Sequence, residues 1–334
     1  MTLLDSGVKR VLITGGAGYI GALMTARLLN DGVQVRVLDS LLHGGDAILG
    51  FLHQSGYEFH HGDVRDEEKL KECLQEVDAV LHLAALVGFP VCKKVGREEV
   101  WAVNVEATRS AYRLAKAAGV KRFIFASSYS NYGIAEGKVT EESPLNPQSL
   151  YADSKVAGEE FLLQQTGDPC VTCVRLSTLF GAAPRTRFDL MVNQFALTAH
   201  LGRKLVIYQR DFNRAFVHIQ DVVEALCRIF SSSPEVVGGQ VFNVGGDELN
   251  SSKGQLVTLI RKHWPNLDVE ERTLEFSGDM RSIHVSFEKI RTVLGFVPGW
   301  TLEDGIKELH EMLTHGLISD PESSRFRNHP ELVS

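Results

Sequence analysis

The stretch that decides the fold spans residues 14–21 and reads Thr14-Gly15-Gly16-Ala17-Gly18-Tyr19-Ile20-Gly21. It follows an apolar run at residues 8–14 that predicts a strand, and it opens a helical pattern that ends near Asn30. Glycine lets the backbone turn tightly and approach a pyrophosphate, while the helix N-terminus offers free N–H groups to the phosphates. Because glycines alone only mark turns, the strand–turn–helix context carries the prediction of a dinucleotide-binding loop. The expected contacts are Gly15, Gly18, Tyr19, Ile20 and Gly21.

An acidic residue, Asp39, ends the second predicted strand at residues 33–39. A carboxylate about twenty residues past such glycines can accept hydrogen bonds from both hydroxyls of an adenosine ribose. It would repel a 2′-phosphate, and no arginine follows it in Ser40-Leu41-Leu42-His43. The sequence therefore favours NAD over NADP as the cofactor. The alternative, an aspartate that only caps a turn, is disfavoured by the glycine loop upstream.

Strands and helices alternate along the first half of the chain. The predicted strands continue at residues 58–61, 79–84, 123–127 and 171–176, and the predicted helices lie at residues 67–75, 97–118 and 150–165. Such alternation predicts an α/β fold, a Rossmann-type doubly wound parallel sheet with helices on both faces. We expect an NAD-binding domain at residues 1–180, with the sheet completed by segments at about 215–245. Residues 181–315 would mostly form a smaller mixed α/β substrate lobe, and residues 316–334 a polar, loosely held tail.

The composition of the 334-residue chain is that of a globular protein, with 44% hydrophobic and 23% charged residues. Its net charge of −7 has no long runs of either sign, which argues against a nucleic-acid partner. The pattern shows neither a signal peptide nor an apolar run of membrane-spanning length. Cys170 and Cys173 form a CxxC within an apolar strand, where small core residues are favoured over zinc ligands. We expect a reduced, cytoplasmic protein without a metal site or a membrane partner.

Candidate catalytic groups lie in Tyr151-Ala152-Asp153-Ser154-Lys155, which places a phenol and an ammonium one helical turn apart. A tyrosine pKa of about 10 is too high for a base at neutral pH, but a nearby lysine cation and an oxidised nicotinamide both favour the phenolate. Tyr151 could then remove a proton from a substrate hydroxyl. On its own this spacing is usually a solvated helix face. The strand end Phe125-Ala126-Ser127-Ser128 adds a hydroxyl at the carboxyl edge of the sheet, where ligands bind.

Several motifs together resemble a known family. They are the glycine loop, Asp39, Gly62-Asp63-Val64, His82-Leu83-Ala84-Ala85, Ser127-Ser128, Tyr132-Gly133 and Tyr151-x-x-x-Lys155. Their order and spacing resemble the extended short-chain dehydrogenase/reductases, in particular the nucleotide-sugar epimerases and dehydratases, the group that includes UDP-galactose 4-epimerase. The resemblance covers about residues 8–315.

The resemblance implies a role for each matching position. Asp63 and Val64 would lie beside the adenine, and Ala84 and Ala85 would line the nicotinamide side of the cofactor. Lys155 would hold the nicotinamide ribose and tune Tyr151. Ser128 matches the catalytic Ser/Thr of the family, and its neighbour Ser127 takes that place if the register differs by one. Asn104 matches a family asparagine that is largely structural.

The second half of the chain would supply the substrate contacts. The resemblance suggests Ser128, Tyr129, Thr178, Asn193, Arg214 and Arg281. For Arg214 and Arg281 the alternative is an ordinary surface salt bridge, and His218 fits a core residue better than a catalyst. The 4,6-dehydratases carry an Asp-Glu pair directly after the Ser/Thr, whereas this chain has Tyr129 and Ser130. Thr178 stands where many members have Asn, and Ala215 where Asp is common.

These patterns predict an NAD-dependent nucleotide-sugar epimerase that oxidises C4 of the sugar transiently, with Tyr151 as the base. The alternatives are a 4-dehydrogenase that stops at the 4-keto product and an atypical dehydratase. A non-catalytic NAD-binding regulator is a more remote alternative, because such proteins commonly lose the tyrosine or the lysine. The resemblance also implies a homodimer formed through the helices at 97–118 and 150–165. The nucleotide base and the sugar stay open.

Overall fold

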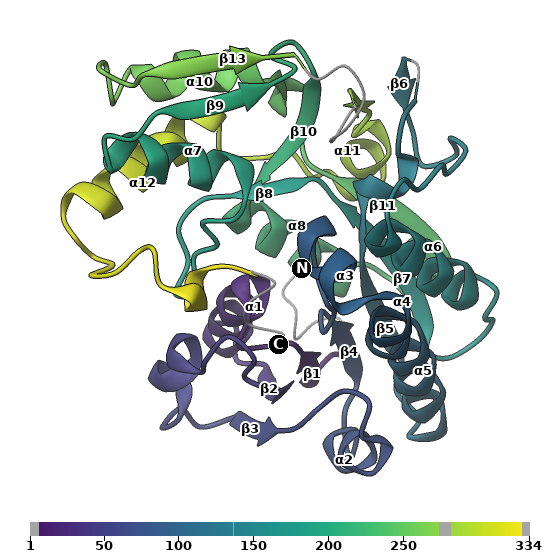
Figure 1. The fold of residues 1–334 in the computed structure, drawn as a ribbon. Helices are drawn as coiled ribbons and strands as arrows, with labels where there is room; N and C mark the ends of the chain where they lie inside the picture. The colour runs from purple at the N-terminus through teal and green to yellow at the C-terminus, as the bar shows by residue number, and fades with distance from the viewer. Residues whose placement is uncertain (1–6, 136, 274–281, 329–334) are drawn as a thin grey trace.

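The centre of the molecule is a seven-stranded, all-parallel sheet (Figure 1). The computed structural model describes residues 7–135, 137–273 and 282–328. From one edge to the other the strands are β11 (Gln240–Val244), β7 (Cys170–Leu176), β5 (Arg122–Ser128), β4 (Ala79–His82), β1 (Arg10–Thr14), β2 (Gln34–Asp39) and β3 (Tyr57–His61). The strand order reverses between β1 and β4, which opens a crevice at the carboxyl ends of the strands. The predicted Rossmann-type doubly wound fold is confirmed.

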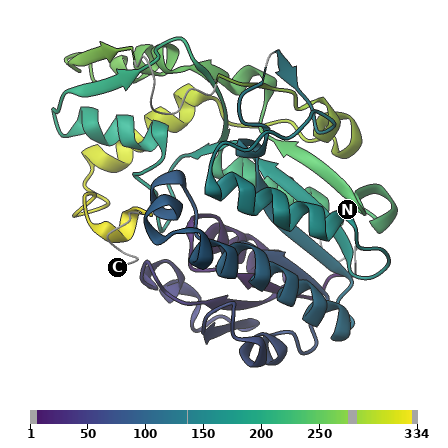
Figure 2. The same ribbon diagram turned by 45° about the vertical axis from the view of Figure 1, so that its right-hand side comes forward.

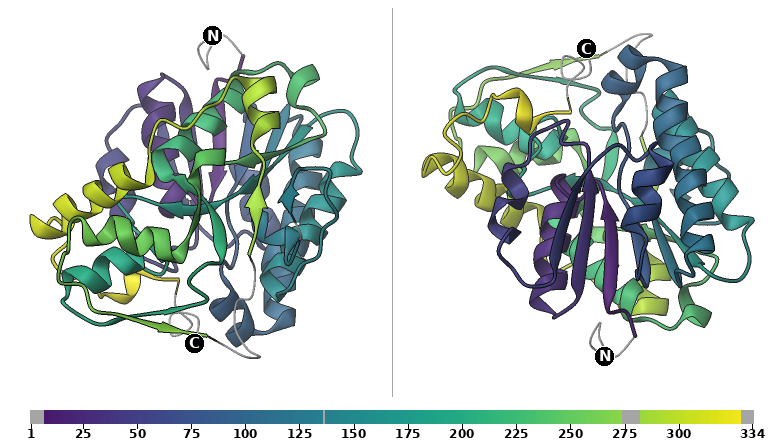
Figure 3. Two further views of the ribbon diagram at one scale, coloured as in Figure 1. Left: turned by 90° about the horizontal axis from the view of Figure 1, so that it is seen from above. Right: turned by 90° about the horizontal axis from the view of Figure 1, so that it is seen from below.

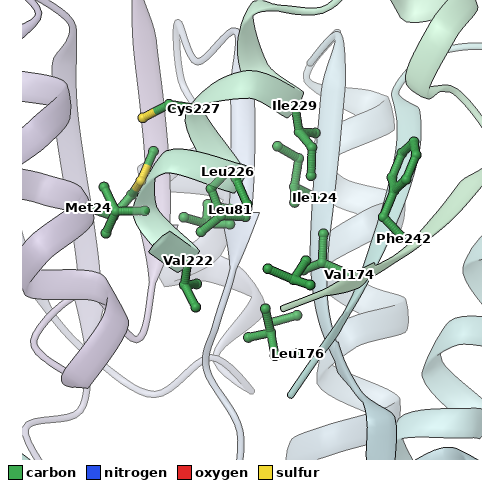
Figure 4. Close-up of a cluster of buried hydrophobic side chains, with 14 of the residues drawn as sticks. Met24, Leu81, Ile124, Val174, Leu176, Val222, Leu226, Cys227, Ile229 and Phe242 are labelled. Atoms are coloured by element: carbon green, nitrogen blue, oxygen red, sulfur yellow. The ribbon is translucent and has the colours of Figure 1, made fainter. Parts of the chain in front are cut away.

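Helices cover both faces of this sheet because alternate strand residues are apolar on each side. Ile13 packs with α1 (Tyr19–Asn30) and α8 (Ile219–Ser231), and Figure 4 shows this cluster, in which Met24, Val222 and Leu226 approach strand residues. Leu12, the neighbour of Ile13, packs on the other face. That face carries α2 (Glu67–Cys73), α5 (Ala107–Ala117) and α6 (Leu150–Leu163), and Figure 2 brings α5 and α6 forward.

The helix predicted at residues 97–118 is interrupted. It consists of α4 (Arg97–Trp101), a π-helical turn η3 (Ala102–Glu106) and α5. Asn104 lies in the π turn, where its Oδ1 accepts from the Leu86 N–H at 2.8 Å and its Nδ2 donates to Ser154 Oγ at 3.0 Å. The π turn therefore ties the loop after β4 to the helix that carries Tyr151 and Lys155.

A smaller mixed α/β lobe, with its own hydrophobic core, lies beside the central sheet (Figure 3). Its principal elements are β8 (Thr178–Phe180), α7 (Met191–His200), β9 (Leu205–Tyr208), β10 (Asn213–His218), β12 (Asn250–Ser252), α10 (Lys253–Arg261), β13 (Val269–Arg272) and α12 (Leu302–Thr314). The connecting elements are η2 (Asp46–Phe51), α3 (Phe89–Val95), η4 (Tyr129–Tyr132), β6 (Lys138–Val139), α9 (Pro234–Val237), η5 (Asp247–Leu249), β14 (His284–Val285), α11 (Glu288–Leu294) and η6 (Ser324–Phe326).

One expectation for the second half needs correction, and one helix was missed. Of the segments at 215–245, only β11 joins the central sheet, whereas β10 pairs with β8 and β12 in a small separate sheet. Between them lies α8, a helix that the sequence analysis did not propose. The spacing of Val222, Val223, Leu226 and Ile229 is the helical signal that would have revealed it.

Of the loosely held tail predicted at residues 316–334, the structure describes residues up to 328, and the part around Phe326 is held in place. Residues 329–334 lie outside the described residues. Phe326 is only 5% exposed and packs in the core of the lobe, with its ring centroid 6.1 Å from that of Phe188. The Phe188 N–H donates to the Phe326 carbonyl at 2.8 Å. One aromatic side chain therefore fixes a segment in which most neighbours are polar. Among the described residues, no helix has the length and apolar character needed to cross a membrane.

Candidate active site

A cavity of about 770 Å³ lies between the carboxyl ends of the parallel strands and the lobe. Almost all of the residues predicted to bind cofactor or substrate line it. They are Gly15, Gly18, Tyr19, Ile20, Gly21, Asp39, Asp63, Val64, Ala84, Ala85, Ser127, Ser128, Tyr129, Tyr151, Lys155, Thr178 and Arg214. The fold therefore brings predicted site residues that are up to 199 positions apart in the sequence, from Gly15 to Arg214, into the lining of one cavity.

The glycine loop is a close-packed turn, here called the cradle, in which side chains would collide with the neighbouring backbone. Gly15 has φ +74°, and a Cβ there would lie 2.8 Å from the backbone N of Ala84. A Cβ on Gly21 would lie 2.5 Å from the Gly15 carbonyl oxygen. Gly18 is the N-cap of α1 and has no side chain to occupy the end of the helix. The first N–H groups of α1 thus face a space that suits a pyrophosphate.

Asp39 lies at the end of β2 beside this loop. Its carboxylate accepts hydrogen bonds from the Ala17 N–H at 2.9 Å and the Leu41 N–H at 2.8 Å. Burial raises the pKa of Asp39, and these two amides oppose that rise. Asp63 bonds to Arg65, whose guanidinium lowers the pKa of that carboxyl. Two carboxylates therefore line the part of the cavity that follows β2 and β3.

The two serines at the end of β5 are bonded differently. Ser127 Oγ donates to Glu159 Oε2 at 2.7 Å and accepts from Asn131 Nδ2 at 3.0 Å, so it belongs to a buried network. Ser128 Oγ accepts from the Ser130 N–H at 3.1 Å, which leaves its own O–H proton able to donate. Neighbouring strand residues point to opposite faces, which is why only one of the two meets Glu159.

Tyr151 and Lys155 lie on α6 and both line the cavity. Lys155 is 3% exposed; its Nζ donates to the Ala126 carbonyl at 2.8 Å and lies 4.8 Å from the Phe125 ring centroid. Burial lowers the pKa of Lys155 to about 8. A cation held this way is ready to exchange its proton near neutral pH.

A buried polar network supports this part of the site, and sequence reasoning missed it. Glu159 lies one turn after Lys155 on α6, and its carboxylate forms an ion pair with Arg175 of β7. Arg175 Nη1 also donates to the Tyr132 hydroxyl at 2.8 Å and to the Glu141 carbonyl at 3.0 Å. Glu159 thereby links Arg175 of β7 to Ser127 of β5. Its i, i+4 spacing from Lys155 puts both on one face of the helix, a signal available in the sequence.

Not every predicted substrate contact reaches the cavity wall. Asn193 is fully buried: its Oδ1 accepts from the Gly181 N–H and its Nδ2 donates to the Arg187 carbonyl, both at 3.0 Å. It therefore positions the polar loop before α7 and is not part of the lining. Arg281 lies outside the described residues. Tyr129 and Thr178 line the cavity and join their hydroxyls at 2.8 Å.

Positive charge gathers on the lobe side of the cavity. The charged lining residues that follow β7 are Arg185, Arg187, Asp189, Arg214 and Lys253, four cations against one carboxylate. Arg187 pairs with Asp189 at 2.7 Å, and Arg185 is buried. The sequence analysis did not propose Arg185 or Arg187 as contacts, although both lie in the loop directly before α7, which carries the proposed contact Asn193.

The fit to a dinucleotide rests on the cradle at Gly15 and on Asp39 facing the same cavity. Among the described residues, no group of three or more His, Cys, Asp or Glu side chains could hold a metal ion. The five cysteines are free thiols, and Cys173 is buried on β7.

Known proteins show the same fold and similar sequences. A UDP-glucose 4-epimerase of Mycolicibacterium smegmatis is 32% identical over 312 residues, which are 90% of this chain and 97% of that protein. A dTDP-glucose 4,6-dehydratase of Streptomyces griseus is 29% identical over 311 residues, 89% of this chain and 91% of that protein.

The solved structure of MoeE5 in complex with UDP-glucuronic acid and NAD has a TM-score of 0.80 and 27% identity, over 92% of this chain and 100% of that one. The family model described as NAD dependent epimerase/dehydratase family matches residues 11–245. This match covers most of the chain and includes the glycine loop, Asp39, Ser128, Tyr151 and Lys155. The chain therefore belongs to the NAD-dependent epimerase/dehydratase family, and NAD is its cofactor.

Proposed function

We propose that this protein is a nucleotide-sugar 4-epimerase that acts through a transient 4-keto sugar. The observation that carries the proposal is that Tyr151, Lys155 and Ser128 line one cavity with the glycine cradle and Asp39. When bound, NAD would supply the hydride transfer at C4 of the sugar, in both the oxidation and the reduction. Gly15, Gly18, Asp39 and Lys155 would hold NAD.

Proton transfer would fall to Tyr151. Its phenolate would accept the proton of the C4 hydroxyl while the carbon is oxidised, and the phenol would return the proton in the reduction. Lys155 favours the phenolate because a cation stabilises a nearby anion. The O–H of Ser128, whose oxygen already accepts from the Ser130 N–H, would donate to the reacting sugar oxygen.

The nucleotide diphosphate would lie along the lobe side of the cavity. Arg214 is 2% exposed, and its Nη1 donates to the Asn213 carbonyl at 3.1 Å, so it is held in a fixed place in the wall. Guanidinium groups suit phosphate oxygens because their N–H donors are arranged in a planar fork. Together with Arg187 and Lys253, this arginine supports a diphosphate-bearing substrate.

Dehydration fits the site less well than epimerisation. Elimination of water requires an acid and a base beside the sugar, and the two positions after Ser128 carry Tyr129 and Ser130. The Tyr129 hydroxyl is hydrogen-bonded to the Thr178 hydroxyl, and neither Tyr129 nor Ser130 carries a carboxylate. A 4-dehydrogenase that releases the 4-keto sugar is the second candidate, since the same proton and hydride transfers serve its single oxidation.

The test is incubation with UDP-, dTDP-, GDP- and CDP-sugars, following both 340 nm absorbance and product identity. Interconversion of C4 epimers without net NADH supports the epimerase. A keto sugar formed with one NADH per turnover supports the dehydrogenase and contradicts the epimerase.

Tyr151→Phe should lower kcat about 100-fold or more. Tyr112→Phe removes a hydroxyl from a tyrosine packed against Phe123 and Phe161 away from the lining, and serves as the matched control. Turnover that survives Tyr151→Phe would overturn the assignment of the base.

We further propose that the chain forms a homodimer through α5 and α6. Aromatic and cationic groups meet there, with Arg109 and Arg113 within 6 Å of the Phe161 ring centroid. Light scattering of Phe161→Glu should show a monomer if this face is the interface, and a dimer of unchanged mass would contradict it.

A further inference from the structure

We propose that residues 320–328, here called the C-terminal clasp, form part of the cofactor site and hold the adenosine end of the dinucleotide in place. This inference rests on NAD as the cofactor and not on the reaction proposed above. Nothing in the composition of the clasp suggests such a role. Its place in the fold does, because it runs from α12 back towards the N-terminal half of the chain (Figure 1).

The clasp is anchored firmly in the lobe. Phe326 is buried against Phe188, and the Phe188 N–H donates to its carbonyl. At its outer end, Glu322 accepts two hydrogen bonds from Arg203, at 2.6 and 3.0 Å. The segment between these anchors therefore has a defined path over the molecule.

From this anchor the clasp reaches across to the dinucleotide-binding half. Arg325 Nη1 donates to Asp46 Oδ2 at 2.7 Å. Asp46 begins η2, the segment that follows β2 and Asp39. Arg325 is thus paired with a residue 279 positions earlier in the chain. That residue, Asp46, lies seven positions after Asp39, the proposed acceptor of the ribose hydrogen bonds.

The clasp also meets the cavity directly. Asn328 lines it, and its Oδ1 accepts from Arg185 Nη2 at 2.6 Å, while Arg185 Nε donates to the Arg325 carbonyl at 3.2 Å. Arg185 lines the same cavity as Asp39, and each charge acts on the other. The clasp therefore fixes a cation beside the carboxylate that is expected to hold the ribose.

This arrangement has a kinetic consequence. A dinucleotide seated between Asp39 and Arg185 can leave more easily after the contacts of the clasp have opened. A tightly retained cofactor suits an enzyme that must use the same molecule for both an oxidation and a reduction. Breaking the Asp46–Arg325 pair should speed release, and because both side chains are well exposed the effect of this pair alone is about two- to fivefold.

The experiment measures NADH release without any substrate. The full-length protein is loaded with NADH, excess NAD⁺ is added, and the fall in bound-NADH fluorescence gives the dissociation rate. Asp46→Asn, Arg325→Gln and the double variant should each raise the rate about two- to fivefold and to the same extent, because either single change breaks the same pair. Asn328→Ala, which removes the acceptor of Arg185, should raise it as well. The wild-type rate should increase with salt, whereas the double variant should respond less.

The matched control is Lys121→Gln, which breaks an exposed ion pair with Asp168 beside the amino ends of β5 and β7, at the opposite end of these strands from the cavity. Its NADH release should stay at the wild-type rate. Unchanged rates in all clasp variants, or an equal acceleration in Lys121→Gln, would overturn the proposal. Since no sugar is present, these outcomes do not depend on whether the protein is an epimerase, and a failed epimerase assay leaves the clasp result standing.

Discussion

Replacing Glu159 by glutamine should destabilise the protein strongly, because Arg175 would keep its charge in the interior without a negatively charged partner. The two side chains are 2% and 5% exposed. Burial opposes the charge on Arg175, yet the bond and the charge of Glu159 raise its pKa above the usual value. The two carboxylate oxygens of Glu159 accept hydrogen bonds from Arg175, Ser127 and Asn131, and Arg175 donates to both of them. Whichever way the glutamine amide turns, its NH₂ group therefore faces another donor.

The magnitude follows from that burial. Removing one partner of a buried ion pair costs about 3–5 kcal/mol. For 334 residues the unfolding entropy is about 0.7 kcal/mol/K, so the expected fall in Tm is about 4–7 °C. Tm is measured by circular dichroism on the cofactor-free protein. Arg203→Gln breaks a pair whose side chains are 58% and 43% exposed, and it should shift Tm by about 1 °C or less. Equal shifts in the two variants would refute the reasoning that burial makes the Glu159 pair important.

Three further changes test the cofactor half of the site. Gly15→Ala places a Cβ 2.8 Å from the Ala84 nitrogen at φ +74°, so NAD affinity should fall about tenfold by calorimetry; wild-type affinity would contradict the cradle. Asp39→Ser should weaken NAD binding about tenfold or more while NADP binding improves, and an unchanged NAD/NADP ratio would argue against the ribose contact. Burial lowers the pKa of Lys155 from 10.5 to about 8, so between these values the unfolded chain binds more protons and this group makes the free energy of unfolding rise with pH. Lys155→Met should remove that slope, and ¹³C NMR of the lysine side chain should show a midpoint near 8; a midpoint at 10 or above would contradict it.

The sequence alone was sufficient for the dinucleotide-binding half of the fold. The glycine loop, Asp39, and the Tyr151–Lys155 spacing are local patterns, each set by one turn or one helix face. Local geometry follows from residues that are close in the chain, so the strand–turn–helix unit and its parallel sheet could be predicted from them. The same patterns indicated a family to which the chain belongs.

Only the tertiary structure decided which side chains meet across the site. The sequence allowed either Ser127 or Ser128 to face the ligand, and the partner that distinguishes them, Glu159, lies on another element. Asn193 was expected at the substrate but is buried beneath the loop, because its hydrogen-bond partners come from Gly181 and Arg187.

The C-terminal segment shows the same limit most clearly. Its polar composition predicts a loose tail, and nothing nearby in the sequence contradicts that prediction. Its position is set instead by Phe326 in the core of the lobe and by contacts with Arg185 and Asp46, which are 140 and 279 residues away from Arg325. Contacts at such separations leave no periodic signal in the chain, since they depend on how whole elements pack and not on the residues beside them.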